Sequence, residues 1–212
     1  MSASPLLPCF TPDAFRFGEV ASMTVALTRV ETATAAGYLA DLSPLRKKLI
    51  VGRGCDSWLS SNALPNPRLM QRLAAEGCWV ARIGAQQVLA GGDINAAAAN
   101  RLALDAATLP CMVQNYDAAE IAFGGVSAAP LLAELCALDL TQFAADAWIP
   151  TLFAGVEVGL YCEPAGSRYR VVCAPADGPY LFTTLAELTR EFGGAVVGFA
   201  EYSNPALTGG VS

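Results

Sequence analysis

The sequence predicts an α+β protein built from two related α/β sandwich halves, each with helices on a mostly antiparallel sheet. The order strand, glycine, helix, strand pair, helix occurs twice along the chain. Two apolar runs that end in glycine occupy matching places, Leu49-Ile50-Val51-Gly52 and Ile121-Ala122-Phe123-Gly124. Two short runs can agree by chance, so the repeated order of elements carries more of the argument than the glycines do.

The chain is expected to divide into an arm and a folded region. Residues 1–21 are rich in Pro, Ser and Phe and show no steady hydrophobic period. They predict an extended N-terminal arm, either disordered or laid along a partner. Residues 22–212 predict a folded region made of two halves, about 22–110 and 111–200.

The first half should begin with strands. Residues 23–32 are rich in β-branched side chains, and residues 47–51 form another short apolar run. Gly52-Arg53-Gly54 breaks that run, and residues 55–62 have helical spacing with Trp58 and Leu59 on one face. Residues 78–90 predict a hairpin with its turn near Gly84-Ala85. The Ala-rich residues 94–107 predict a helix, with Asp93 or Asn95 near its N-cap.

The second half repeats this order. Residues 118–123 predict a strand, and residues 126–138 a helix with Leu131, Leu132 and Leu135 on one face. Residues 148–154 and 156–163 predict a strand pair around Gly155, and residues 169–174 a third strand. Residues 180–192 predict a helix whose apolar stripe is Leu181, Leu185 and Leu188. Gly193-Gly194 should end that helix.

The composition favours a buried core or a partner interface over a membrane span. Of the 212 residues, 54% are hydrophobic and only 15% are charged, against about 25% charged in ordinary soluble domains. The longest uncharged run, residues 121–133, contains two glycines and a proline and is shorter than the ~20 apolar residues of a spanning helix. An obligate subunit would put this apolar surface into an interface. An Ala-rich sequence from a GC-rich genome would show the same statistic.

Charge and targeting features point to a cytoplasmic protein that binds neither nucleic acid nor membranes. The net charge is −6, which disfavours attraction to polyanions. Arg46-Lys47-Lys48, with Arg53 nearby, is the main basic cluster. It fits a solvated strand end, or alternatively a contact with an acidic partner or a polyglutamyl tail. Residues 1–10 lack the basic segment of a signal peptide.

The side chains available exclude most familiar catalytic arrangements. The chain has no histidine, which removes Ser-His-Asp and Cys-His mechanisms and the commonest metal ligand. It has no G-x-G-x-x-G motif and no P-loop. The seven cysteines include no C-x-x-C pair, so they predict buried reduced thiols and neither a disulfide framework nor a zinc site. We therefore assign no catalytic, cofactor-binding or metal-binding residue to this chain.

Several segments resemble the aminomethyltransferase-like, folate-binding superfamily and, within it, the gamma subunit of heterotetrameric sarcosine oxidase. The segments are Asp41-Leu42-Ser43, Leu49-Ile50-Val51-Gly52 leading into Trp58-Leu59, Val80-Ala81-Arg82-Ile83-Gly84-Ala85, residues 123–140, and Tyr169-Arg170-Val171-Val172 with the following helix. The resemblance spans about residues 38–195, and each motif is loose.

The resemblance implies a role inside a complex. It implies the fold of the aminomethyltransferase N-terminal region and a non-catalytic gamma subunit without its own cofactor. FAD, covalently bound FMN, NAD and tetrahydrofolate would belong to partner subunits. Those partners would be larger flavoprotein subunits, alpha and beta, and a small delta subunit. The complex would demethylate sarcosine oxidatively and pass the one-carbon unit to tetrahydrofolate.

Three alternatives remain open from the residues. The chain could be a stand-alone folate-dependent one-carbon carrier, for which Asp41, Asp56, Asp93 and Asp117 are candidates by residue type only. Turn capping explains Asp41 as well. It could be the gamma subunit of a related N-methyl amino acid or opine dehydrogenase. It could also be a soluble interaction domain, with tryptophans as interface anchors or, more ordinarily, as core residues; these are Trp58, Trp79 and Trp148.

Overall fold

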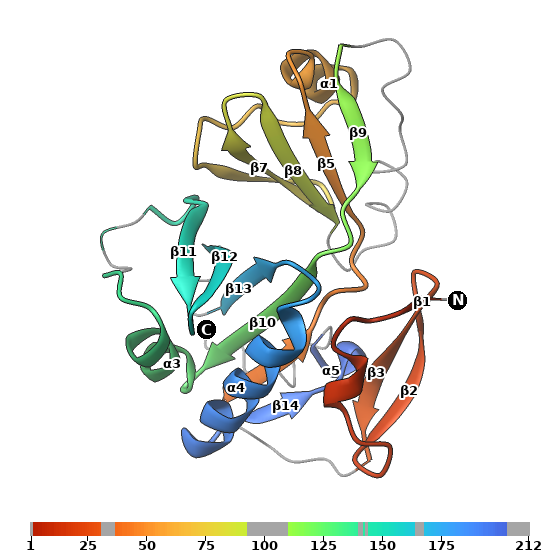
Figure 1. Cartoon of the computed structure of the whole chain (residues 1–212), viewed down its shortest axis with the longest axis vertical. Coiled ribbons are helices and arrows are strands. Elements are labelled where there is room, and N and C mark those ends of the chain that lie inside the picture. The colour runs from red at the N-terminus through yellow and green to blue at the C-terminus, as the bar shows by residue number, and fades with distance from the viewer. Residues whose placement is uncertain are drawn as a thin grey trace. The chain divides into compact units, whose positions relative to one another are not determined.

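A computed structural model describes residues 2–30, 37–92, 110–139, 142, 144–163 and 168–202. Within them the chain forms two compact units (Figure 1). Unit 1 consists of residues 1–44, 118–145 and 150–212, and unit 2 of residues 45–117 and 146–149. Unit 1 therefore takes segments from both ends of the sequence, whereas unit 2 is formed mainly by the internal stretch 45–117. These boundaries differ from the predicted halves, which were continuous stretches meeting near residue 110.

The described residues of unit 2 form a five-stranded antiparallel sheet and one helix. Its strand order is β6-β7-β8-β5-β9. The strands are β5 (Lys47–Val51), β6 (Arg72–Ala75), β7 (Cys78–Gly84), β8 (Gln87–Gly92) and β9 (Met112–Asn115). Helix α1 (Cys55–Ser61) follows β5 across Gly52, whose φ of 128° lies in the region that favours glycine. The predicted hairpin and the helix after β5 are confirmed.

Unit 1 contains a six-stranded sheet with the order β11-β12-β13-β10-β4-β14. The strands are β4 (Gly37–Asp41), β10 (Ala119–Gly125), β11 (Ile149–Phe153), β12 (Val156–Cys162), β13 (Arg168–Cys173) and β14 (Ala195–Val197). The pairs from β12 to β4 are antiparallel, whereas β14 runs parallel to β4. The helices are α3 (Ala128–Leu135), α4 (Gly178–Glu191) and α5 (Phe199–Tyr202).

The N-terminal residues are folded, which corrects the prediction of an extended arm over residues 1–21. Strand β1 (Ser2–Ala3) and strand β2 (Phe15–Val20) both pair with β3 (Met23–Arg29) in a three-stranded sheet. A short 3₁₀ helix spans Leu7–Cys9. Leu6 and Phe10 are buried. The prediction was wrong because these apolar side chains are spaced by turns and not by a regular period.

Other differences from the sequence prediction are at element ends and in short elements that were not predicted. Helix α3 is shorter than the predicted 126–138, whereas α4 matches the predicted 180–192 closely. Strands β6, β9 and β14 and helix α5 were not predicted, because each has only three or four residues. The predicted helix over residues 94–107 lies outside the described residues. The class is a mixture of helices and mostly antiparallel sheets, as predicted.

Candidate functional site

The most concentrated polar chemistry in the described residues lies on one face of the six-stranded sheet. Arg170 of β13 stands opposite Ala122 of β10 and Tyr161 of β12. Residues directly opposite each other in antiparallel strands point to the same face. Glu120 is two residues from Ala122, so it shares that face. The register thus brings an arginine, a glutamate and a tyrosine together inside the protein.

These groups form a closed hydrogen-bonding network, which we call the Arg170 network. Arg170 donates from Nη1 to Glu120 Oε1 at 3.1 Å and from Nε to Glu163 Oε1 at 2.5 Å. The Tyr161 hydroxyl donates to Glu120 Oε1 at 3.0 Å. The Tyr202 hydroxyl, from α5, donates to Glu163 Oε1 at 3.0 Å. Five side chains are therefore joined: one each from β10, β12, β13 and α5, and Glu163 from just after β12.

Electrostatics keep this network ionised at Arg170. Burial by itself lowers the pKa of the Arg170 guanidinium, but the surrounding tyrosine and glutamate oxygens raise it above its ordinary value. For the Tyr202 phenol, whose charged form is the anion, burial raises the pKa. Arg170 therefore stays a cation and Tyr202 stays protonated through the physiological range. Because the guanidinium bonds to Glu120, Glu163 and Tyr202, the network ties neighbouring strands of the sheet to α5.

Tyr38 lies beside this network on β4. Its ring packs edge-on against Tyr202 with 5.6 Å between centroids. Its hydroxyl is buried and has no hydrogen-bond partner within the described part of the chain. A Cβ at Gly124 would lie 2.5 Å from that hydroxyl oxygen. The glycine at position 124, within β10, is thus explained by the close packing of Tyr38.

Three of the four aspartates singled out from the sequence lie in the described residues. Asp41 is buried and caps a turn: its Oδ1 accepts the Ser43 backbone N–H at 2.9 Å, and Ser4 Oγ also donates to it. Asp56 has a 65% exposed side chain that pairs with Arg82. Asp117 is exposed. Asp93 lies outside the described residues. Asp41 therefore has the turn-capping role that residue type alone had left open.

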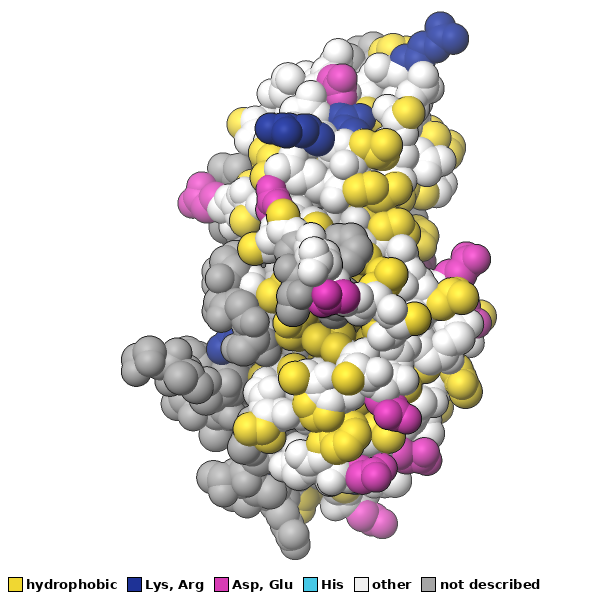
Figure 2. Space-filling model, turned by 90° about the vertical axis from the view of Figure 1, so that its left-hand side faces the viewer, with side chains coloured by type: hydrophobic (Ala, Val, Ile, Leu, Met, Phe, Trp, Pro, Cys, Tyr) yellow, Lys and Arg dark blue, Asp and Glu magenta, His cyan; other side chains and the backbone are white. Residues whose placement is uncertain are grey.

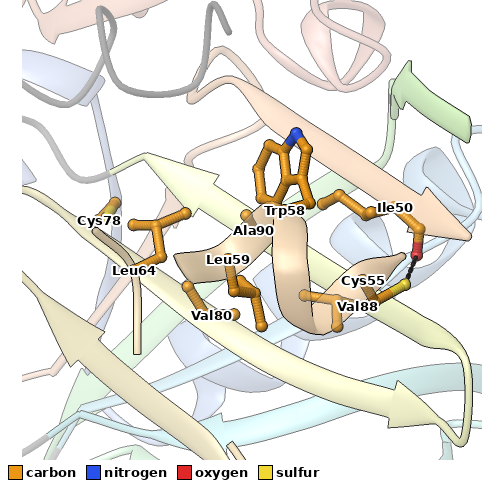
Figure 3. Close-up of a cluster of buried hydrophobic side chains, with 9 residues drawn as sticks. All are labelled: Ile50, Cys55, Trp58, Leu59, Leu64, Cys78, Val80, Val88 and Ala90. Carbon is orange, nitrogen blue, oxygen red and sulfur yellow. Dashed lines mark hydrogen bonds between the residues drawn. The ribbon is translucent and has the colours of Figure 1, made fainter. Parts of the chain in front are cut away.

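The tryptophans belong to the core. Trp58 is fully buried in a cluster of unit 2, and Figure 3 shows side chains of α1 directed onto β5, β7 and β8. Trp79 and Trp148 are also buried, and their rings stack with centroids 5.6 Å apart. Because all three side chains are buried within their own unit, they are core residues and not exposed interface anchors.

The basic cluster divides between core and surface. Lys47 is buried, and its Nζ donates to the Leu45 carbonyl at 2.8 Å. Lys48 is half-buried, whereas Arg46 and Arg53 are exposed. These residues therefore do not form one continuous cationic patch for an acidic tail.

The cysteines divide between buried and partly buried positions, with Cys55, Cys78, Cys136 and Cys173 buried. All seven cysteines are free thiols. Burial, followed by the charge of Asp177, raises the pKa of Cys173 to about 11, so this thiol is unreactive near neutral pH. Within the described ranges, no group of three or more metal-ligating side chains occurs, and no helix is long and apolar enough to cross a membrane.

Solved structures identify the fold. No family profile and no curated protein sequence matches the chain. Its structure resembles glycine cleavage system aminomethyltransferase T from Bartonella henselae, with a TM-score of 0.70 at 18% identity over 98% of this chain. The fold is aminomethyltransferase-like. The match takes in 62% of the Bartonella chain, so this chain spans less than two thirds of that protein.

A second match comes from an oxidase complex. Heterotetrameric sarcosine oxidase from Corynebacterium sp. U-96, in complex with pyrrole 2-carboxylate, contains a chain with a TM-score of 0.64 at 18% identity. The alignment covers 77% of this aminomethyltransferase-like chain and 89% of the oxidase chain. At these identities the two matches establish the shared fold.

The Arg170 network was missed at the sequence level. Glu120 and Arg170 stand within strands that otherwise read as buried apolar runs, Ala118 to Phe123 and Tyr169 to Cys173. A charged residue inside such a run is a signal of a buried ion pair, because an isolated buried charge is strongly disfavoured. Two such interruptions of opposite sign could have been matched to each other.

Proposed function

We propose that this chain is the small, non-catalytic gamma subunit of a heterotetrameric, flavin-dependent sarcosine oxidase. The observation that carries the proposal is the mutual coverage with a sarcosine oxidase chain, 77% of this chain and 89% of that one. Such coverage means that the two chains are similar in length. The aminomethyltransferase chain, by contrast, extends well beyond the match.

The side chains of this chain are consistent with a non-catalytic role. Without histidine, the chain lacks the commonest general base. In its most concentrated polar network, Arg170 is bonded to Glu120 and Glu163 of the same chain. FAD, FMN, NAD and tetrahydrofolate would then be held by partner subunits, the larger alpha and beta chains and a small delta chain. A cytoplasmic location belongs to the same proposal.

The low charge of the chain also supports assembly with partners. Only 15% of residues are charged, and several large apolar side chains are exposed (Figure 2). Obligate interfaces are rich in such side chains. We expect the isolated chain to bind the dye ANS and to aggregate at high concentration. A monomer that stays soluble at high concentration, with no ANS-binding surface, would contradict the obligate-subunit role.

Assembly is the direct test of the proposal. The chain is co-expressed with the genes that flank its own and the product is analysed by native mass spectrometry. We expect a complex that contains this chain and larger flavin-carrying subunits. The complex should take up oxygen when sarcosine is added. An isolated chain that carries its own flavin, or that oxidises an amine alone, would refute the proposal.

The runner-up is a stand-alone folate-dependent one-carbon carrier. The observation in its favour is the aminomethyltransferase match, which covers 98% of this chain at a TM-score of 0.70. Calorimetric titration of the isolated chain with tetrahydrofolate separates the two proposals. A 1:1 complex favours the carrier, whereas no heat of binding favours the gamma subunit.

A sister complex would use the same kind of subunit with another substrate. The gamma subunit of a related N-methyl amino acid or opine dehydrogenase would carry the substrate pocket in a different chain. The assembled complex is therefore assayed with sarcosine, N-methylglutamate and an opine in parallel. The preferred substrate assigns the complex, and this chain is not expected to influence that preference.

A further inference from the structure

Basic residues are absent from a long central stretch of the sequence. Residues 102–167 contain no Lys or Arg but include eight acidic residues. This stretch supplies α3, β11 and β12 of unit 1. Three of these acidic residues are exposed on or next to α3 and β12, so a surface built from these elements carries negative charge. Such a surface is suited to a partner of the opposite charge.

Exposed apolar side chains lie on the same elements. Leu138 follows α3, Leu152 is on β11, and Tyr180 is in the first turn of α4; they are 38%, 59% and 59% exposed. The three elements meet at the turn between β11 and β12. The Tyr180 hydroxyl donates to the Ala154 carbonyl at 3.4 Å, and the Ala154 N–H donates to the Leu135 carbonyl at 3.1 Å.

Acidic side chains border these apolar residues. Glu134 is exposed on α3, Asp139 is exposed just beyond it, and Glu157 is exposed on β12, two residues after the turn. We call the six residues the α3 edge surface: Leu138, Leu152, Tyr180, Glu134, Asp139 and Glu157. Strand β11 is the edge strand of its sheet. Figure 2, which views the side carrying α3 and β11, shows hydrophobic and acidic side chains interspersed.

We propose that the α3 edge surface docks a partner protein whose contact region presents Lys and Arg side chains around an apolar centre. The apolar side chains would supply the desolvated centre of the interface and the carboxylates its charged rim. The proposal rests on the proposed function, in which the partner is a flavin-carrying subunit of the same complex.

A second copy of this chain fits the surface poorly. A twofold interface brings the same patch of both copies together. The carboxylates Glu134, Asp139 and Glu157 would then face their own counterparts. Like charges placed opposite each other across an interface oppose association. A basic partner has no such conflict, so the sign of the charge selects a different protein as the occupant.

Charge reversal tests the rim. The double variant Glu134→Lys with Glu157→Lys is compared with Asp13→Lys with Glu19→Lys, which changes the net charge equally at exposed sites near and on β2. The probe is the flavin-carrying subunits co-expressed from the flanking genes, detected by flavin absorbance. We expect the first variant to bind at least ~10-fold more weakly and the control to bind within ~2-fold of the wild type. Wild-type binding should also weaken as salt is raised.

Truncation of the apolar centre is the second arm. Leu152→Ser is compared with Val30→Ser, because Val30 is also exposed but lies after β3 in the same unit. We expect Leu152→Ser to weaken binding at least ~10-fold and Val30→Ser to leave it unchanged. Neither side chain belongs to the core, so we expect both variants to fold. Thermal unfolding of each isolated variant verifies this.

Each outcome decides between the two proposals. If wild type binds the flavoprotein and only the α3 edge variants lose binding, both proposals are supported. If all variants bind equally, the docking surface is wrong and the gamma-subunit role stands. If the α3 edge variants lose binding to a co-expressed basic subunit without flavin, the surface stands and the gamma-subunit role falls. If wild type binds none of the co-expressed subunits, both proposals are overturned.

Discussion

The five-stranded sheet of unit 2 and the six-stranded sheet of unit 1 share a strand order but are stabilised by different chemistry. Matching strands are β6 with β11, β7 with β12, β8 with β13, β5 with β10 and β9 with β4. In unit 2 the helix after the central strand packs an apolar cluster around Trp58. In unit 1 the equivalent sheet also carries the buried Arg170 network. One arrangement of strands therefore accepts either an apolar or an ionic interior.

The difference shows where a charge can be buried. Arg170 and Glu120 are placed by register on one face of neighbouring strands, so each supplies the counter-charge that the other needs. Phe123 and Tyr169 alternate with them and stack on the opposite face, 5.7 Å apart. Because successive side chains of a strand point to opposite faces, the ion pair lies on one face of the sheet and the aromatic rings on the other.

The largest expected effect comes from breaking the ionic interior. Arg170→Ala leaves Glu120, which is fully buried, and Glu163 without their cation. Removing one partner of a buried ion pair costs about 3–5 kcal/mol. We therefore expect the free energy of unfolding, measured by urea denaturation, to fall by about 4 kcal/mol. Arg190→Ala, at an exposed position of α4, should change it by less than about 0.5 kcal/mol. Similar values for the two variants would show that the network contributes little.

The apolar interior of unit 2 gives a slightly smaller effect. Leu59→Ala removes a fully buried side chain from the Trp58 cluster and should lower the free energy of unfolding by about 3 kcal/mol. Native-state hydrogen exchange should show lost protection in β5, β7 and β8 before β10 and β13. Ser60→Ala, an exposed neighbour on α1, is the matched control. Simultaneous loss of protection in both sheets would mean that they unfold as one unit.

Substitutions at two glycines, one in each unit, compare the free-energy cost of steric crowding with that of backbone strain. Gly52 has a φ of 128°, and a Cβ there would lie 2.8 Å from the Pro110 carbonyl oxygen. Gly52→Ala should lower the free energy of unfolding by about 2 kcal/mol, since strain and crowding act together. Gly155, between β11 and β12, has a φ of 80° and open space around it. Gly155→Ala should cost about 1 kcal/mol by thermal unfolding, from strain alone. Equal costs would mean that the contact with Pro110 relaxes freely.

The smallest expected effect is on how the free energy of unfolding depends on pH. It is compared for a thiol of unit 1, Cys173, and a thiol of unit 2, Cys55. Burial raises the pKa of Cys173 from 9.0 to about 11. The unfolded chain then loses this thiol proton first as pH rises, so the stabilisation is complete below about pH 9 and is lost towards pH 11. Cys173→Ala should flatten urea-derived stability over that range. Cys55→Ala is the comparison in unit 2, where burial also raises the pKa of the thiol, and it should flatten the slope in the same direction. An unchanged slope in Cys173→Ala would contradict the shift.

Local pattern predicted most of the longer elements but not their assembly. Helix α4 and the β7–β8 hairpin follow from apolar periodicity and turn residues, which act within a few positions. The pairing of β4 with β10 and of β5 with β9 depends on contacts more than 60 residues apart, which no local window contains. Strand β9 has only four residues, three of them exposed, so its sequence carries little strand signal.

The candidate site was harder to predict than the fold. Aspartates were singled out because carboxylates can act as acids, bases and ligands, yet Asp41 caps a turn and the exposed Asp56 pairs with the buried Arg82. The buried Glu120 and Arg170 lie 50 positions apart, and only the strand register brings them together. A residue's type shows what it can do, whereas its neighbours across the sheet decide what it does.

The way in which strands that follow one another along the chain belong to different sheets determines what happens when the chain is cut. Strand β4 continues along the chain into β5, and β9 continues into β10, while β4 pairs with β10 and β5 with β9. A chain severed between β8 and β9 would give two fragments, each missing strands from both sheets. Neither fragment could complete a sheet alone, and the two would recover native structure only by recombining. The molecule should therefore behave as a natural split protein, in which association of the pieces is the same event as folding.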